Sequence, residues 1–289
     1  MNGVAAAVVS SALGGTAGAL TRYVIGASDP VTLAAFRFGI GFLIIFPLAL
    51  ALRARWPRGR DWLGVALLGI AFFAFFFFLY NIAMRYTSAA RGSLALSTLP
   101  LTTMVLAFLL GREALSKRKV AGVLTAVSGV AFALWGGLAD APEGAWRGDL
   151  IMLGATVVMA LYSIWSRPFM QRSSMLGFLA AGMGFGALAS VALSLMTGKY
   201  LLIQNLNGPQ WLAVICLGVF GGALAFYLWV YALERTTPTR VTNTMTVNPI
   251  SASLLAALLI GEPLGLPLAF GIVAVGAGIW LASTAATPR

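Results

Sequence analysis

Residues 98–115, TLPLTTMVLAFLLGREAL, and residues 247–264, VNPISASLLAALLIGEPL, carry the same pattern 149 residues apart. In both stretches a proline stands third, an apolar run follows, and a glutamate stands sixteenth. Shared leucines and alanines mean little in an apolar chain, but proline and glutamate in one register indicate an internal repeat. The match runs without a gap from about residue 74 to residue 133 when the chain is shifted onto itself. The paired residues are Pro100 and Pro249, and Glu113 and Glu262.

The composition is that of a membrane protein. Of the 289 residues, 60% are hydrophobic and 9% are charged, and the mean hydropathy is +0.92, whereas a soluble domain carries about 25% charged residues. The apolar residues fall into runs close to the roughly 20 residues that an α-helix needs to cross a bilayer. We therefore predict an all-α integral membrane protein with ten transmembrane helices, at residues 3–25, 31–52, 62–84, 87–110, 118–138, 149–167, 175–196, 211–233, 240–260 and 266–285.

The repeat offset predicts an inverted topology. It places the third to fifth predicted helices on the eighth to tenth, so the repeating unit has five helices. Because five is odd, the second unit must cross the membrane in the opposite sense to the first. We predict two inverted five-helix repeats, at residues 1–140 and 147–286. Inverted repeats are typical of secondary transporters, whose substrate site lies near the bilayer midplane between the halves.

The net charge of +11 is a topology signal. If ten helices alternate, thirteen of the 19 Lys and Arg residues lie on one side and five on the other, with Arg37 inside a span. Cytoplasmic loops carry the excess of Lys and Arg, so we expect both termini in the cytoplasm. The charge therefore predicts no nucleic-acid partner. The lipid bilayer is the expected surrounding, and the oligomeric state stays open.

Several chemistries lack the residues that they need. The eight acidic residues all lie in loops or at the ends of predicted spans, which weakens a proton-driven exporter of cationic drugs. No GxxxxGK[ST] motif is present, so no nucleotide-driven pump is expected. There is no histidine and the one cysteine is Cys216, so we expect no metal site, no cofactor and no catalytic residues. The chain is not expected to be an enzyme.

The repeated residues resemble a known family. Pro100 and Pro249, the sequences GRE at 111–113 and GE at 261–262, and Arg37 after DPVTLAAF resemble the drug/metabolite transporter superfamily in its EamA-like branch. Within that branch the chain looks most like the bacterial inner-membrane exporters of aromatic and other neutral amino acids. The resemblance implies a small-molecule substrate of the amino-acid class and a location in a bacterial cytoplasmic membrane. It also implies that the fifth and tenth helices lie outside the cavity, so their glycines at 122, 129, 271 and 278 would serve close packing.

Polar and aromatic residues inside the spans are the candidate substrate contacts. Polar groups are costly in a bilayer and tend to face a cavity or a partner helix. An aromatic cavity with amides and hydroxyls would suit an apolar or aromatic side chain on a zwitterionic backbone. Interface belts of Tyr and Trp, and hydrogen bonds within helices, are the competing interpretation. The candidates are Tyr80, Asn81, Ser97, Tyr162, Trp165, Tyr227, Trp229, Asn243 and Asn248.

Five further residues carry their own hypotheses. Arg37 either extends back to the interface or binds a substrate carboxylate. Pro100 and Pro249 are candidate hinges, or static kinks, because a proline removes a helix hydrogen bond. Glu113 and Glu262, on opposite membrane faces, are predicted structural clasps that bond backbone amides at the start of the next helix, with a gating role as the alternative.

Three functions follow from these features. The leading hypothesis is a passive or weakly coupled exporter of neutral or aromatic amino acids that works by alternating access. The second is a transporter of anions such as nucleotide-sugars, using Arg37, Arg91 and Arg240. The third is a membrane scaffold without transport activity, for which an inverted repeat has no evident use.

Overall fold

The described part of the protein is almost entirely helical. The computed structural model describes residues 2–25, 27–86, 89–133, 135, 143–198, 200–201, 204, 206–260 and 266–284, and these residues contain no β-strand. Six helical runs among them are long and apolar enough to cross a membrane: Gly3–Ile25, Pro30–Ala51, Asp61–Ala83, Ala145–Arg172, Met175–Met196 and Gly208–Arg235. Two shorter apolar helices are Leu94–Leu109 and Ala269–Ser283. The all-α prediction is confirmed, and the count of ten spans stays a prediction.

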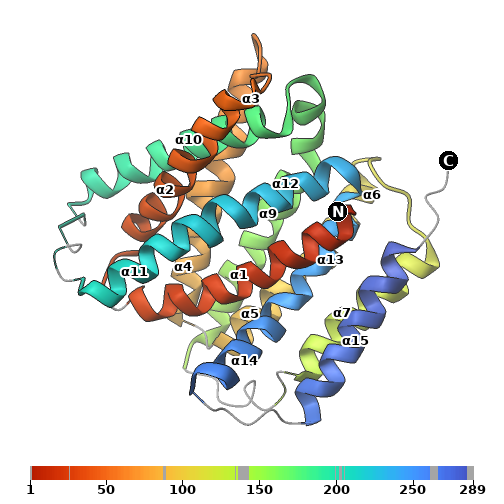
Figure 1. Cartoon of the computed structure of the whole chain (residues 1–289). Helices are drawn as coiled ribbons and strands as arrows, with labels where there is room; N and C mark the ends of the chain where they lie inside the picture. Colours follow the sequence, from red (N-terminus) through yellow and green to blue (C-terminus); the bar gives the residue numbers. More distant parts are fainter. Residues whose placement is uncertain are drawn as a thin grey trace.

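Each predicted span contains helix. In the first half the elements are α1 (Gly3–Ile25), α2 (Pro30–Ala51), α3 (Asp61–Gly69), η1 (Ile70–Phe76), α4 (Phe77–Tyr86), α5 (Ala89–Ser97), α6 (Leu99–Leu109) and α7 (Lys117–Ala133). In the second half they are α9 (Ala145–Arg172), α10 (Met175–Met196), α11 (Gly208–Cys216), η3 (Leu217–Leu224), α12 (Ala225–Arg235), α13 (Pro238–Asn243), η4 (Thr244–Thr246), α14 (Val247–Ile260) and α15 (Leu266–Ser283). Figure 1 shows how these helices pack together and cross one another.

Local sequence signals set several helix starts. The Asp29 carboxylate accepts hydrogen bonds from Val31 N and Thr32 N, and Pro30 occupies the first turn of α2. Ser174 caps α10 by accepting from Gly177 N at 3.1 Å. Such caps bond the N–H groups that lack a partner in the first helical turn.

Four predicted spans are interrupted, and the interruptions occur in pairs. Within the third and eighth spans, η1 and η3 are π-helical, and η1 overlaps η3 when shifted by 149 residues. The fourth span is interrupted at Thr98, just before Pro100, and the ninth span is interrupted at η4, just before Pro249. Pro100 has no N–H to donate to the carbonyl four residues earlier. The two halves thus share irregularities as well as residues.

Helices α7 and α15 pair closely at one side of the molecule (Figure 1). A Cβ atom at Gly278 would lie 2.6 Å from Ala126 N and from Gly122 O, so only glycine fits there. A Cβ atom at Gly122 would lie 2.5 Å from Ala282 N. Small residues at such contacts let membrane helices approach closely. The close-packing prediction is confirmed at Gly122, Gly129 and Gly278.

Glu113 has a different backbone partner from the one predicted. Its carboxylate accepts from Thr239 N at 3.0 Å, in the first turn of α13, and from Lys119 Nζ at 2.8 Å. Ser116 Oγ accepts from Lys119 N at 3.2 Å at the start of α7, where the glutamate was expected to bond. Glu113 therefore joins the first half of the chain to the second. Glu262 lies outside the described residues.

We expect Gly278→Ala to destabilise the protein, because the added methyl group meets backbone atoms that cannot move aside. Overpacking of this kind costs about 1–3 kcal/mol. The matched control is Gly276→Ala on the same helix, where a Cβ atom meets nothing within 4 Å. Thermal unfolding in detergent should show a lower midpoint for Gly278→Ala and an unchanged or higher one for Gly276→Ala. Equal midpoints would show that α7 and α15 do not pack through these glycines.

Candidate functional site

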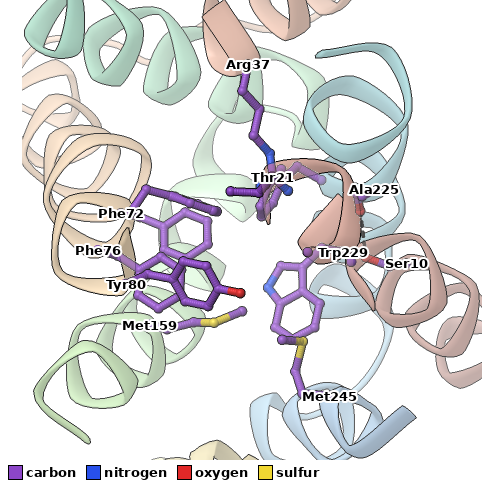
Figure 2. A pocket seen from close by; sticks show the side chains of 14 residues that line it. Ser10, Thr21, Arg37, Phe72, Phe76, Tyr80, Met159, Ala225, Trp229 and Met245 are labelled. Carbon is purple, nitrogen blue, oxygen red and sulfur yellow. Dashed lines mark hydrogen bonds between the residues drawn. The ribbon is translucent and has the colours of Figure 1, made fainter. Parts of the chain in front are cut away.

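A small cavity of about 60 Å³ lies among helices from both halves of the chain. Figure 2 shows aromatic rings on one side, the Trp229 indole opposite them, and Arg37 entering from above. A cavity of this size has room for a few water molecules and is well below the several hundred Å³ of a typical ligand site. Its lining residues are Ser10, Gly14, Gly18, Thr21, Arg37, Phe72, Phe76, Phe77, Tyr80, Met159, Ala225, Phe226, Trp229 and Met245.

A backbone carbonyl in the π-helix η3 holds Arg37 in place. The carbonyl oxygen of Gly221 accepts from Arg37 NH2 at 2.8 Å and from Arg37 Nε at 3.2 Å. In an α-helix Ala225 N would bond to Gly221 O, but here it bonds to Phe220 O, five residues back. The π-helical register therefore leaves the Gly221 carbonyl available to the guanidinium. π-helical turns occur often at functional sites.

The Arg37 guanidinium is buried and has no acidic partner in the part of the chain that the structure describes. Arg37 is 9% exposed, and its Cζ atom lies 4.8 Å from the centroid of the Phe77 ring. None of the ion pairs among the described residues includes Arg37. The Arg37 side chain does not extend back to the membrane interface, which was one of its two hypotheses. It ends inside the helix bundle.

Trp229 presents an unused hydrogen-bond donor to the cavity. The residue is 2% exposed, and its Nε1 atom has no hydrogen-bond partner among the described residues. Figure 2 shows the indole nitrogen and the Tyr80 hydroxyl facing each other across the cavity. Ser10 Oγ donates to Ala225 O at 2.7 Å, which leaves its oxygen lone pairs as acceptors. Leaving a buried donor unbonded costs about 1–3 kcal/mol.

Two predicted contacts on α9 lie away from the cavity. Tyr162 is in the core, 1% exposed, and stacks on Phe72 with ring centroids 4.1 Å apart. It therefore supports the cavity wall from behind. Trp165 is 40% exposed on the outer surface, where it lines a groove with Leu68 and Phe169.

The other polar candidates are also outside the cavity lining. Asn81 Nδ2 donates to Pro30 O at 3.1 Å and so ties α4 to the start of α2. Asn243 Nδ2 donates to Gly278 O at 3.4 Å, and Asn248 packs against Gly14 and Gly15 of α1. Ser97 is buried, and the ring of Tyr227 lies beside that of Tyr231. Of the ten predicted substrate contacts, the cavity is lined by Arg37, Tyr80 and Trp229.

Arg240, one of the three arginines of the predicted anion site, lies away from the cavity. Arg240 Nε donates to Ala282 O at 3.3 Å, on α15, and Arg240 is not among the cavity residues. The side chain of Arg91 lies outside the described residues. Of the two arginines whose side chains the structure describes, Arg37 lines the cavity and Arg240 does not.

One face of α1 lines the cavity and was missed from sequence. Ser10, Gly14, Gly18 and Thr21 are spaced four, four and three apart, so they lie on one helical face. That spacing was a detectable signal, but the residues are small and weakly polar. The aromatic wall formed by Phe72, Phe76 and Phe77 was also missed, because phenylalanine in an apolar span is ordinary.

Comparison with known proteins gives consistent results. The model of the EamA-like transporter family matches residues 1–135 and 146–284. The uncharacterized transporter YyaM of Bacillus subtilis is 24% identical over 269 residues, which cover 91% of this chain and 88% of YyaM. An uncharacterized protein of Pseudomonas aeruginosa is 30% identical over 256 residues, which cover 88% of this chain and 84% of the Pseudomonas protein.

Two further similarities bear on substrate and on fold. A probable terminal-alkyne amino-acid exporter of Streptantibioticus cattleyicolor is 27% identical over 246 residues, or 83% of this chain and 80% of the exporter. A protein of known crystal structure superposes with a TM-score of 0.78 at 24% sequence identity. The match covers 97% of this chain and 96% of the other protein's chain. That likeness shows the fold alone.

We expect Tyr162→Phe to stabilise the protein, because the Tyr162 hydroxyl is buried with no partner among the described residues. Removing an unbonded buried hydroxyl relieves about 1–3 kcal/mol and keeps the stacking on Phe72. Thermal unfolding should show a higher midpoint for this variant. Tyr23→Phe, at a residue that is 55% exposed, is the control and should change nothing. A lower midpoint for Tyr162→Phe would mean that the hydroxyl does have a partner.

Proposed function

The chain belongs to the EamA-like transporter family and is a multi-pass membrane protein, and from this premise we propose that it exports neutral amino acids, above all aromatic ones. In this proposal it works in the cytoplasmic membrane of a bacterium by alternating access, with both termini in the cytoplasm. The two five-helix repeats cross the membrane in opposite senses, and the cavity between them holds the substrate.

One observation carries the proposal: two hydrogen-bond donors face the cavity without an anion. Arg37 is a buried cation with no acidic partner among the described residues, and the Trp229 N–H is unbonded. A buried charge without a counter-charge is costly, and such a residue inside a membrane protein points to a substrate pathway. A substrate carboxylate would accept hydrogen bonds from both donors.

The remaining walls suit the rest of an amino acid. Phe72 and Phe76 are stacked rings, 5.2 Å apart between centroids, and would contact a flat apolar side chain. The lone pairs on Ser10 Oγ and the aromatic faces would receive the ammonium group, since a cation is attracted to a ring face. The amino-acid exporter of Streptantibioticus cattleyicolor, at 27% identity, supports the same substrate class.

The alternative substrates fit this cavity less well. A drug or other organic cation would meet the Arg37 guanidinium and, among the described lining residues, no carboxylate. A nucleotide-sugar carries two phosphate charges, whereas Arg240 donates to Ala282 O and lies away from the cavity. One guanidinium and one indole N–H match a single carboxylate better.

The small cavity and the broken helices support alternating access. A cavity of about 60 Å³ is too small for an amino acid, so the substrate must enter, bind and leave in states in which this cavity is wider. Pro100 and Pro249 stand just after the breaks in the fourth and ninth spans. We assign these two prolines the role of hinges about which α6 and α14, the parts of the two spans that follow the breaks, move.

We expect the substrate carboxylate to be required for binding. In proteoliposomes loaded with unlabelled tryptophan, labelled tryptophan should enter by counterflow, and a nucleotide-sugar or a lipophilic cation should not. Indole-3-propionate, which lacks the ammonium group, should compete, whereas tryptamine, which lacks the carboxylate, should not. Trp229→Phe should weaken tryptophan binding about tenfold, as expected for a lost hydrogen bond to a charged group.

Arg37→Gln should weaken binding at least as much as Trp229→Phe. Because Arg37 also joins α2 to η3, thermal unfolding must accompany this measurement. Trp280→Phe, at an exposed residue of α15, is the matched control and should bind like the parent protein. Competition by tryptamine equal to that by indole-3-propionate would contradict the carboxylate site without any mutation.

We expect Pro100→Ala to slow counterflow and leave substrate affinity unchanged. Alanine restores an N–H that can bond to Leu96 O, and α5 and α6 would then tend to join into one straight helix. Pro47→Ala is the matched control, because Pro47 lies inside the unbroken helix α2. The measurements are the initial counterflow rate and the equilibrium dissociation constant. An unchanged rate for Pro100→Ala would remove the hinge role.

A further inference from the structure

A second recess lies on the outer surface, away from the central cavity. It is a groove of about 540 Å³ between the first part of the third span and the end of α9. Its apolar walls include Leu67 and Leu68 of α3 and Trp165 and Phe169 of α9, and its polar residues are Arg112 and Arg172. None of these residues lines the central cavity.

The groove is apolar along its length and cationic at one end. Arg172 is the last residue of α9 and Arg112 follows α6, so both arginines stand where helices end. Trp165 lies seven residues before Arg172, which is about 10 Å along an α-helix. Leu67 is 60% exposed and Trp165 is 40% exposed. An apolar wall beside a cationic end suits an acyl chain that ends in an anionic head group.

Arg172 is held in a fixed position at the cationic end. Its Nε and NH2 atoms bond to the Asp61 carboxylate at 2.8–3.1 Å, and its guanidinium lies 4.8 Å from the centroid of the Phe169 ring. Asp61 neutralises one of the two arginine charges. The Arg112 side chain has no bonding partner among the described residues and is exposed. The groove therefore keeps one net positive charge and free guanidinium donors.

We propose that this groove binds one anionic phospholipid, with its phosphodiester on Arg112 and Arg172 and an acyl chain along Leu67, Leu68 and Trp165. Guanidinium groups bond phosphate oxygens strongly, through paired N–H donors. Basic pockets between membrane helices on the side rich in Lys and Arg are suited to anionic head groups. A zwitterionic lipid would bring its own cation to a site that is already positive.

The position of the lipid links it to both halves of the chain. α3 continues through η1, which carries Phe72 and Phe76 of the central cavity, and α9 carries Met159. A lipid in the groove contacts both elements at the end where Arg172 and Asp61 already join them. It would therefore stabilise the contact between the first and second repeats at this membrane face. This site does not depend on which substrate is transported.

The test is lipid binding to the purified full-length protein in detergent. Dioleoyl phosphatidylglycerol and dioleoyl phosphatidylcholine are titrated separately, with bound lipid counted by native mass spectrometry and stability followed by thermal unfolding. We expect phosphatidylglycerol to bind more tightly and to raise the midpoint more than phosphatidylcholine. Arg112→Gln should weaken phosphatidylglycerol binding about fivefold, the effect of one arginine near the membrane surface.

Matched variants separate this groove from the general positive surface. Arg58→Gln removes an exposed arginine outside the groove and should leave the affinity unchanged within about twofold. Trp165→Ala should weaken binding, whereas Trp146→Ala, at an exposed tryptophan on the same helix, should not. The tryptophan pair keeps the test valid if Arg112→Gln fails to fold.

Three outcomes would overturn the proposal. The first is equal binding of the two lipids, which would make the groove an ordinary lipid-facing surface. The second is an equal loss on Arg58→Gln and Arg112→Gln, which would show unspecific attraction to the charged face. The third is that glycerophosphate or inorganic phosphate alone gives the same thermal shift as the lipid, which would make this an anion site without a role for the apolar walls.

Discussion

The structure depends on a buried guanidinium that one backbone carbonyl holds. Placing an ion in a low-dielectric interior costs several kcal/mol, and Arg37 meets this cost with two hydrogen bonds to Gly221 O and with the face of the Phe77 ring. The carbonyl is available because η3 shifts the backbone ladder by one residue. Helix α2 and η3 can approach this closely because Gly222 has no Cβ atom. A Cβ atom there would lie 2.6 Å from Arg37 O. Arginine, π-helix and glycine together create a polar cavity among apolar helices.

The two halves share their irregularities, but only the first half has an arginine inside its second helix. Both have a π-helical segment in the third span, a break before a proline in the fourth, and a fifth span that packs through glycine. The second helix of the second half, α10, has no charged residue, so Arg37 has no counterpart there. Glu113 bonds across the halves to Thr239 N. A shared backbone plan thus supports a site whose charge comes from one half.

Much of the fold could be predicted from the sequence, and less of the site. The spans followed from the length of the apolar runs, because bilayer thickness sets helix length. Tyr162 and Trp165 show the limit. They are three residues apart and therefore on one side of α9, yet Tyr162 stacks on Phe72 in the core and Trp165 lies in the surface groove. Only the position of the neighbouring elements α3 and η1 decides which side chain is covered.

The sequence by itself determined the helical class, the repeat and the presence of one arginine within a span. These depend on composition and on spacing along the chain, which no tertiary contact can change. The tertiary structure decided that Arg37 points inward, that α1 supplies a cavity wall through small residues, and that Glu113 caps α13 instead of α7. The physical reason is that an apolar helix in a membrane protein is apolar on every side. Its sequence does not record which side meets a partner helix, and that choice is made only when the helices pack.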